Sequence, residues 1–312
     1  MRSDRREAPH VKLRTIGSLQ VSEIGLGCNN FGMRLDAAES AVVVHKALDV
    51  GITFFDTAES YGPSQEYLGK ALGKRRKDVI VATKFGNRGT GAGRANILRA
   101  VEDSLRALRT DYIDLYQQHR PDPNTAPAET LEALEALRTQ GKIREYGCSN
   151  FTVEMLEGAA AQRRRGAGRA GWASVQNEYS LFHRAPETDG VLEFCERDKV
   201  GLLPYFPLAN GMLTGKYRKG RPQPPGTRIT EMDYFKDSWS LERLERLERL
   251  ISFAEGQGHT ILELAFGYLL ARPAVASVIA GATSAAQVEA NAGAGEWGLS
   301  PDEVSEVQAL LE

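Results

Sequence analysis

The sequence predicts an α/β protein folded as a (β/α)8, or TIM, barrel. Eight short segments rich in β-branched or aromatic residues alternate with longer amphipathic segments between residues 24 and 280. This alternation is typical of parallel strands joined by crossover helices. Eight such units close most economically into a barrel, whereas doubly wound sheets usually contain five or six strands. We therefore expect residues 1–312 to form a single domain.

The expected strands follow an N-terminal hairpin. VKLRTI and LQVSEI flank Gly17 and Ser18, which suit a two-residue turn. Residues 1–10 are charged and lack the apolar centre of a signal peptide, so we interpret them as a flexible leader. The eight strand candidates are IGLG, ITFFD, VIVATK, YIDLYQQH, IREYGCS, ASVQN, GLLPY and VASVIA.

Helical patterns lie between these strands, and several open with Ser, Thr or Asp, which are favoured N-caps. The repeat LERLERLERL places a leucine at every third position, so its leucines spread over half of a helix face. We expect a helix lying on the barrel surface there, with a partner-binding helix as the alternative. A C-terminal helix is expected over 301–312. The other helices are expected to begin near Ala37, Ser64, Arg94, Pro127, Thr152, Asp189 and Thr260.

Three segments interrupt the rhythm of the barrel: residues 120–127, 163–171 and 209–240. The last is the longest and mixes Pro and Gly with aromatic residues. Loops of this length in compact domains are usually functional or disordered. We predict that residues 209–240 form a lid-like loop at the active site.

The composition argues against several partners. The chain has 39 basic and 41 acidic residues, a net charge of −2, which does not favour nucleic acid or an acidic membrane surface. No run of about 18 apolar residues predicts a membrane span. Cys28, Cys148 and Cys195 have neither disulfide-framework nor zinc-site spacing, so we expect no metal and a reducing, cytoplasmic setting. The oligomeric state is left open.

Four polar residues follow three consecutive expected strands. Asp56 and Tyr61 lie in FFDTAESYG, Lys84 ends VIVATK, and His119 ends YIDLYQQH. The reactive face of a parallel barrel is at the carboxyl ends of its strands, so these side chains should converge. Each residue alone also has an ordinary structural explanation, as a turn cap, a solvated lysine or a partner of a loop carbonyl.

Together the four residues suit proton donation to a developing alkoxide. Tyrosine, with a pKa near 10, is a poor acid at neutral pH, but a neighbouring ammonium stabilises the phenolate. Asp56 would position Lys84, and Lys84 would lower the barrier to proton release from Tyr61. His119 would orient a polar oxygen.

In this order and at these strand ends, FFDTAESYG, VATKFG and LYQQH resemble the aldo-keto reductase superfamily, including its potassium-channel β-subunit branch. The similarity covers Lys12 to Ala292. Members are barrels that reduce aldehydes and ketones with NADPH, or less often NADH, without a metal. The resemblance implies that Tyr61 is the general acid, that Lys84 and Asp56 support it, and that His119 orients the substrate.

The resemblance also implies a set of cofactor contacts. GCSNF and SVQNEYS match segments that bind the nicotinamide carboxamide, and PYFPLANGMLTGKY matches one that stacks on the ring and follows the pyrophosphate. VIAGATSAAQVEANAGA matches the segment that binds the adenosine phosphate. The implied cofactor contacts are Cys28, Asn29, Asp56, Ser149, Asn150, Gln176, Tyr205, Phe206, Pro207, Leu208, Ala209, Lys216, Arg228, Gly281, Thr283, Gln287 and Asn291.

Three residues depart from the family pattern in the last of these segments. Ala280 replaces a common proline, Ala290 a common acidic residue, and Gln287 a common cationic ligand of the 2′-phosphate. Without that cation the preference for a 2′-phosphate is weaker, although Thr283 and Lys216 can supply donors. We expect NADP as the cofactor, with NAD possible.

The predicted function is therefore NAD(P)H-dependent reduction of a small-molecule aldehyde or ketone. The alternative is a nicotinamide-binding regulatory or redox-sensing subunit with slow turnover, and a third option is cofactor-assisted isomerisation or dehydration. The substrate is left open, because barrel specificity is built by loops. The side chains of Phe31, Met33, Phe85 and Phe182 could line an apolar pocket or simply pack in the core.

Overall fold

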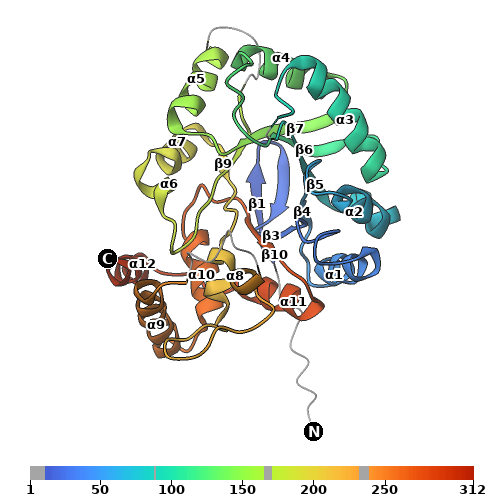
Figure 1. Ribbon diagram of the computed structural model, residues 1–312. Coiled ribbons are helices and arrows are strands. Elements are labelled where there is room, and N and C mark those ends of the chain that lie inside the picture. Colours follow the sequence, from blue (N-terminus) through green and yellow to red (C-terminus); the bar gives the residue numbers. More distant parts are fainter. Residues whose placement is uncertain (1–10, 88, 165–170, 232–238) are drawn as a thin grey trace.

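The computed structural model describes residues 11–87, 89–164, 171–231 and 239–312, and its strands form the predicted barrel (Figure 1). The eight strands pair in parallel in the order β10-β3-β4-β5-β6-β7-β8-β9. A parallel bridge between Leu202 and Val275 closes the cylinder. The strands are β3 (Ile24–Gly27), β4 (Phe54–Asp56), β5 (Ile80–Phe85), β6 (Ile113–Gln118), β7 (Ile143–Ser149), β8 (Ser174–Gln176), β9 (Gly201–Leu202) and β10 (Val278–Gly281).

All eight strand predictions are confirmed, two of them to the residue. IGLG is β3 and IREYGCS is β7. The segment GLLPY is shortened to the two residues of β9. Pro204 within it has no N–H, so it cannot continue the ladder as a donor, although its carbonyl accepts a hydrogen bond from Ile279 N at 3.1 Å.

Helices follow the strands and surround the barrel. The predicted starts at Ala37, Ser64, Arg94 and Pro127 are confirmed, and Thr260 forms a capping box with Glu263. The helices are α1 (Ala37–Asp49), α2 (Ser64–Leu72), α3 (Arg94–Leu108), α4 (Pro127–Thr139), α5 (Val153–Arg164), α6 (Ala185–Thr188), α7 (Val191–Asp198), α8 (Arg228–Glu231), α9 (Leu241–Gly256), α10 (Ile261–Leu270), α11 (Ala285–Gly293) and α12 (Pro301–Leu311).

The start predicted near Asp189 is off by two residues. The helix α7 begins at Val191, whose N–H donates to Asp189 Oδ1 at 3.0 Å. The side chain therefore caps the chain just before the helix. A single turn, α6, lies ahead of it and is not predicted by the sequence pattern.

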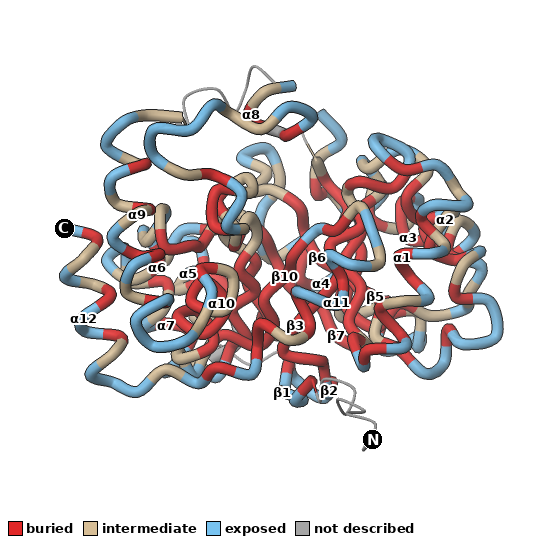
Figure 2. The backbone as a smooth tube through the Cα atoms, turned by 90° about the horizontal axis from the view of Figure 1, so that it is seen from below, coloured by how far each residue is buried: buried red, intermediate tan, exposed pale blue. Residues whose placement is uncertain are grey.

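The predicted hairpin consists of β1 (Leu13–Ile16) and β2 (Leu19–Ser22), with Gly17 and Ser18 at its turn. Gly17 has φ +55°, which glycine adopts without strain. Ser18 N donates to Glu145 Oε1 at 2.8 Å, which fixes the turn beneath β7. Figure 2 shows the hairpin at the end of the barrel opposite α8. The hairpin therefore closes the amino-terminal end of the barrel.

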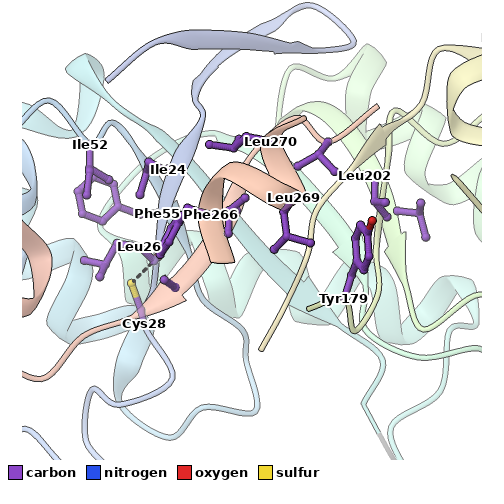
Figure 3. Close-up of a cluster of buried hydrophobic side chains, with 14 of the residues drawn as sticks. Ile24, Leu26, Cys28, Ile52, Phe55, Tyr179, Leu202, Phe266, Leu269 and Leu270 are labelled. Carbon is purple, nitrogen blue, oxygen red and sulfur yellow. Dashed lines mark hydrogen bonds between the residues drawn. The ribbon is translucent and has the colours of Figure 1, made fainter. Parts of the chain in front are cut away.

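Two apolar clusters fill the molecule. The smaller joins hairpin residues, Ile16 among them, to Phe54 and Leu115 of the strands. The larger lies between the strands and the helices, and Figure 3 shows part of it around Leu26 and Phe266. Complete burial of a leucine or phenylalanine side chain stabilises the fold by roughly 1.5–3 kcal/mol.

The aromatic residues that the sequence left open belong to packing rather than to an apolar pocket. The side chains of Phe31 and Phe85 are fully buried in the larger cluster, and Phe182 packs against it. Met33, the fourth candidate, is 57% exposed and is therefore not packed in the core.

The leucine repeat forms α9, which lies on the surface as expected and packs against α10 and α12. Leu244, Leu247 and Leu250 are buried, whereas Leu241 is 64% exposed. A spacing of three drifts around the helix, so the first leucine falls off the buried face.

The long segment after β9 begins with a 3-10 helix, Ala209–Thr214, and later forms α8. It is tied to the loop after β3, because Arg34 Nη2 donates to Gly226 O at 3.0 Å and lies 3.3 Å from Glu231 Oε2. The predicted leader, most of the basic stretch 163–171 and residues 232–238 of the predicted lid lie outside the described residues. Among the described residues, no helix has the length and apolar character needed to cross a membrane.

Candidate active site

The carboxyl ends of the strands surround a cleft of about 810 Å³. Most residues predicted for the site lie on its wall, contributed by loops far apart in the sequence. The predicted residues lining the cleft are Cys28, Asn29, Asp56, Tyr61, His119, Ser149, Asn150, Gln176, Tyr205, Phe206, Pro207, Leu208, Lys216, Gly281, Thr283, Gln287 and Asn291.

Lys84 lies directly behind this wall and is fully buried. Its ammonium Nζ is 2.5 Å from Asp56 Oδ2 and donates to the carbonyl oxygen of Thr57 at 3.0 Å. Burial alone would lower the pKa of Lys84, but Asp56 and Tyr61 outweigh it and raise that pKa. Lys84 is therefore a fixed, charged group beneath the cleft.

The second oxygen of Asp56 is held by two amides. Gln117 Nε2 and Gln176 Nε2 donate to Asp56 Oδ1 at 3.2 and 3.0 Å. Gln117 was not predicted as a site residue, although a glutamine in the middle of a buried strand was a visible signal. Its Oε1 is buried without a hydrogen-bond partner among the described residues. These donors leave Oδ2 facing Lys84.

Tyr61 lies above this pair. Lys84 Nζ is 5.2 Å from the centroid of the Tyr61 ring, and the ring meets His119 edge to face with centroids 5.7 Å apart. Burial raises the pKa of Tyr61, with Asp56 adding to the shift and Lys84 opposing it. The ammonium acts in the expected direction, but in this structure burial outweighs it. Tyr61 therefore keeps its proton at neutral pH.

His119 is held neutral. Burial, together with the charges of Lys84 and Arg120, lowers its pKa to about 3. Its backbone N–H donates to Phe85 O at 2.7 Å, and Nδ1 lies 3.4 Å from Ser60 Oγ. With Nδ1 beside Ser60, Nε2 is the ring nitrogen left for a ligand in the cleft.

A hydrogen-bond chain joins the ends of β7, β8 and β9. Asn150, with φ +62°, donates from Nδ2 to His119 O and to Ser149 Oγ, both at 3.0 Å. Its Oδ1 accepts from Tyr205 OH at 2.8 Å, and Ser149 Oγ donates to Gln176 O at 2.8 Å. Asn150 Oδ1 keeps one lone pair, and Gln176 Oε1 is also an acceptor, so this wall can receive a carboxamide N–H.

The far end of the cleft lies at the amino terminus of α11. Ser284 Oγ accepts from Gln287 N at 3.3 Å, and Gln287 Oε1 accepts from Thr283 N at 2.8 Å. These bonds leave Gln287 Nε2 and the first N–H groups of the helix as donors. Such donors suit the oxygens of a phosphate group.

Between the catalytic end and the α11 end of the cleft, the backbone at two glycines lies close to polar side chains and forms a cradle. A Cβ at Gly281 would lie 3.2 Å from Asn30 Nδ2 and 3.4 Å from Asn29 Oδ1, and one at Gly211 would lie 3.2 Å from Lys216 Nζ. The absence of side chains keeps this part of the cleft open. An open cradle with amides and one lysine fits the pyrophosphate of a dinucleotide.

Of the implied cofactor residues, Ala209 does not line the cleft as expected. Ala209 is 6% exposed, with φ +46°, and its side chain faces the core. Arg228 begins α8, and its side chain lies outside the described part of the structure.

Several cleft residues were not predicted from the sequence. All of them follow a strand or sit in the loop after it, which was the one signal available, but a residue type alone did not single them out. The missed polar residues are Asn30, Arg34, Ser60, Asn87, Arg120, Glu178, Asn210 and Thr214.

Cys28 lies at the cleft with its thiol turned into the protein. Sγ is 3.6 Å from Leu26 O, the dashed line of Figure 3, and burial raises the pKa of the thiol well above its usual value. The thiol is therefore uncharged. Among the described residues, no group of three or more His, Cys, Asp or Glu is arranged to hold a metal ion.

Comparison with known proteins decides the family. The model of the aldo/keto reductase family matches residues 23–312. The chain belongs to the aldo-keto reductase family. This membership confirms the resemblance carried by FFDTAESYG, VATKFG and LYQQH, and it makes the chain an oxidoreductase of a family that acts on carbonyl compounds.

Relatives of this aldo-keto reductase match it along most of their length. It is 33% identical to the aldo-keto reductase YhdN of Bacillus subtilis, over 94% of this chain and 91% of the relative. It is 32% identical to a probable voltage-gated potassium channel subunit beta of rice, over 94% of both chains. The solved holo structure of AKR11C1 from Bacillus halodurans shares 34% identity and a TM-score of 0.80, with 97% of each chain covered.

Proposed function

We propose that this aldo-keto reductase reduces an aldehyde or ketone to an alcohol with NADPH, and that Tyr61 is the general acid. The observation that carries the proposal is the buried Lys84–Asp56 ion pair directly beneath Tyr61 at the cleft. A charged ammonium fixed beside a phenol stabilises the negative charge that develops when the phenol gives up its proton.

His119 and Tyr61 then have different tasks. With a pKa of about 3, His119 carries no proton to donate as an acid at neutral pH, but its neutral ring can donate a hydrogen bond to the carbonyl oxygen. Tyr61 keeps its proton until that oxygen becomes basic. Asp56 holds Lys84 in place, and Gln117 and Gln176 hold Asp56.

A nicotinamide supplies a hydride to the carbonyl carbon when it is bound. Ser149, Asn150 and Gln176 would hold its carboxamide, and Tyr205 would stack on its ring. The proton from Tyr61 goes to the carbonyl oxygen, so one hydride and one proton convert C=O to CH–OH. The tyrosine recovers its proton from solvent.

The remaining contacts would hold the rest of the cofactor. Lys216 and the backbone of residues 206–209 suit the pyrophosphate, with Arg228 assigned by resemblance. Gly281, Thr283, Gln287 and Asn291 suit the adenosine phosphate, and Cys28 and Asn29 line the same cleft. With Lys216 and Gln287 as donors, we expect NADP rather than NAD.

We also propose the domain organisation, the partner and the cellular location of the enzyme. We expect residues 1–312 to act as one domain, with a small carbonyl compound as the partner and the cytoplasm as the location. The three buried cysteines, all of them free thiols, support a reducing compartment.

Pre-steady-state kinetics test the proposal. We expect the purified protein to oxidise NADPH in the presence of aldehydes. The single-turnover rate constant for this oxidation should equal or exceed the rate constant for release of the cofactor. Turnover much slower than cofactor release would favour the regulatory alternative, which is supported by the similarity to channel β subunits. Binding of NADPH without any consumption across a broad carbonyl panel would refute the reductase assignment.

A further inference from the structure

Arg120 is a cation at the catalytic end of the cleft that the proposed reduction does not use. It follows His119 directly, is half-buried and lines the cleft. Among the described residues, no carboxylate pairs with its guanidinium. The other charged groups of the cleft wall have partners, Arg34 with Glu231 and Asp56 with Lys84, while Lys216 lies over the Tyr217 ring.

Two hydrogen-bonding residues lie on the same side of the cleft. Ser60 and Asn87 follow β4 and β5, the strands that precede β6 in the sheet, and both line the cleft. Ser60 Oγ is 3.4 Å from His119 Nδ1, which places the hydroxyl beside the catalytic end. A guanidinium with an amide and a hydroxyl is a donor set that matches a carboxylate or a phosphate.

The charges around His119 agree with this interpretation. The charges that act on its pKa are those of Lys84 and Arg120, and both are positive. Lys84 is paired with Asp56, whereas Arg120 has no carboxylate partner among the described residues. A half-buried cation without a counter-ion favours an anionic ligand, because screening by water is weaker there than at the surface.

The one further carboxylate on the described wall is directed elsewhere. Glu178 lies beyond the end of β8, two strands from β6, and its Oε1 is 3.9 Å from Nδ1 of His183. The apolar candidates Phe31 and Phe85 are buried in the core. The substrate end of the cleft is therefore polar, and positive on the Arg120 side.

We propose that Arg120, assisted by Asn87 and Ser60, binds an anionic group on the substrate, so that the preferred substrates are short aldehydes or ketones carrying a carboxylate or a phosphate. This inference rests on the proposed carbonyl reduction. Because Arg120 is adjacent to His119, the anionic group would lie only a few bonds from the carbonyl.

Matched substrate pairs test the inference. Succinic semialdehyde against butanal isolates a carboxylate, and glyceraldehyde 3-phosphate against glyceraldehyde isolates a phosphate. We expect kcat/KM with NADPH to favour the anionic member at least tenfold in one pair, and that pair identifies the group. Arg120→Gln should lower this ratio at least tenfold. Arg120→Lys should lower it less, because lysine keeps the positive charge but lacks the planar, bidentate donor geometry of the guanidinium.

Arg75→Gln is the matched control. It makes the same change of charge at an exposed arginine that pairs with Asp78 outside the cleft, and it should leave the ratio unchanged. A ratio near one in both pairs, or one that Arg120→Gln does not alter, would overturn the anion site. Reduction of the neutral aldehydes would then still support the reductase. If none of the four compounds were reduced, the proposed function itself would be refuted.

Discussion

The ammonium of Lys84 lies 2.5 Å from the carboxylate of Asp56; the Lys84 side chain is fully buried and that of Asp56 is only 5% exposed. The two residues come from adjacent strands, β5 and β4. A buried charge without its partner is costly, and the carboxylate raises the pKa of Lys84, so the pair holds the ammonium in its charged form. The electrostatics of the whole site depend on it.

Breaking this pair should destabilise the fold. We expect Lys84→Met and Asp56→Asn each to lower the free energy of unfolding by about 3–5 kcal/mol, because each leaves a buried group unpartnered. The double variant should lose less than the sum of the two. Urea unfolding measures all three proteins, and additive losses would mean that the pair is not coupled.

Tyr61→Phe should remove most turnover and leave the cofactor bound. The variant loses only the phenol oxygen, and a positioned acid typically contributes about 10²–10⁴-fold to the rate. Single-turnover NADPH oxidation and the Kd for NADPH are the measurements. Full activity in this variant would exclude Tyr61 as the acid.

The low pKa of His119 should make stability depend on pH. An unfolded histidine titrates near pH 6.5, whereas the folded pKa is about 3, so the unfolded chain binds the proton more tightly. The contribution of His119 is therefore present above about pH 6.5 and is lost as the pH falls toward 3. Between pH 8 and 5 the loss should be about 2 kcal/mol.

His119→Asn provides the control for this pH effect. Urea unfolding of the variant should show a shallower dependence on pH between 8 and 5 than the wild type. The same slope in both proteins would place the proton uptake on other groups.

Gln287 should tune the choice of cofactor. Calorimetric titration should show tighter binding of NADPH than of NADH by the wild type. Gln287→Arg adds a cation at the expected 2′-phosphate and should raise the preference for NADPH about tenfold, since a hydrogen bond to a charged group contributes about 1.5–3 kcal/mol. Gln287→Glu should reverse the preference. If neither variant changes the ratio of the two Kd values, the phosphate is bound elsewhere.

Arg34 should slow the release of cofactor, because it ties the loop after β3 to Gly226 and Glu231 of the long segment. The pair is partly exposed, so its effect on stability should be small. Arg34→Ala should speed NADPH release about 2–5-fold, an increase of the size expected for loss of one surface contact. Stopped-flow displacement gives the rate, and an unchanged rate would show that this contact does not restrain the segment.

Much of the site is predictable because its signals are local. The rhythm of strands and helices follows from hydrophobic periodicity, and residues at the carboxyl ends of parallel strands must meet at one end of the barrel. Periodicity and strand polarity alone therefore predict that Asp56, Tyr61, Lys84 and His119 converge, and the cleft contains or adjoins all four.

Other features depend on packing across the barrel. The position of Gln117 within a buried strand is visible in the sequence, but its hydrogen bond to Asp56 depends on the registers of β4, β5 and β6. The net shift in the pKa of Tyr61 reflects how deeply the ring is buried against how close Lys84 comes, a balance of two opposing effects. Neither quantity follows from residue types.

The barrel, its hairpin and the chemical groups at the strand ends are thus encoded locally, in periodicity and residue type. Which of those groups are paired and which are left alone emerges only when the chain is folded: Asp56 pairs with Lys84, Arg34 pairs with Glu231, and Arg120 has no carboxylate among the described residues. The cause is distance. Coulombic and hydrogen-bond energies change over a few ångströms, and those separations are set by contacts between residues far apart in the chain.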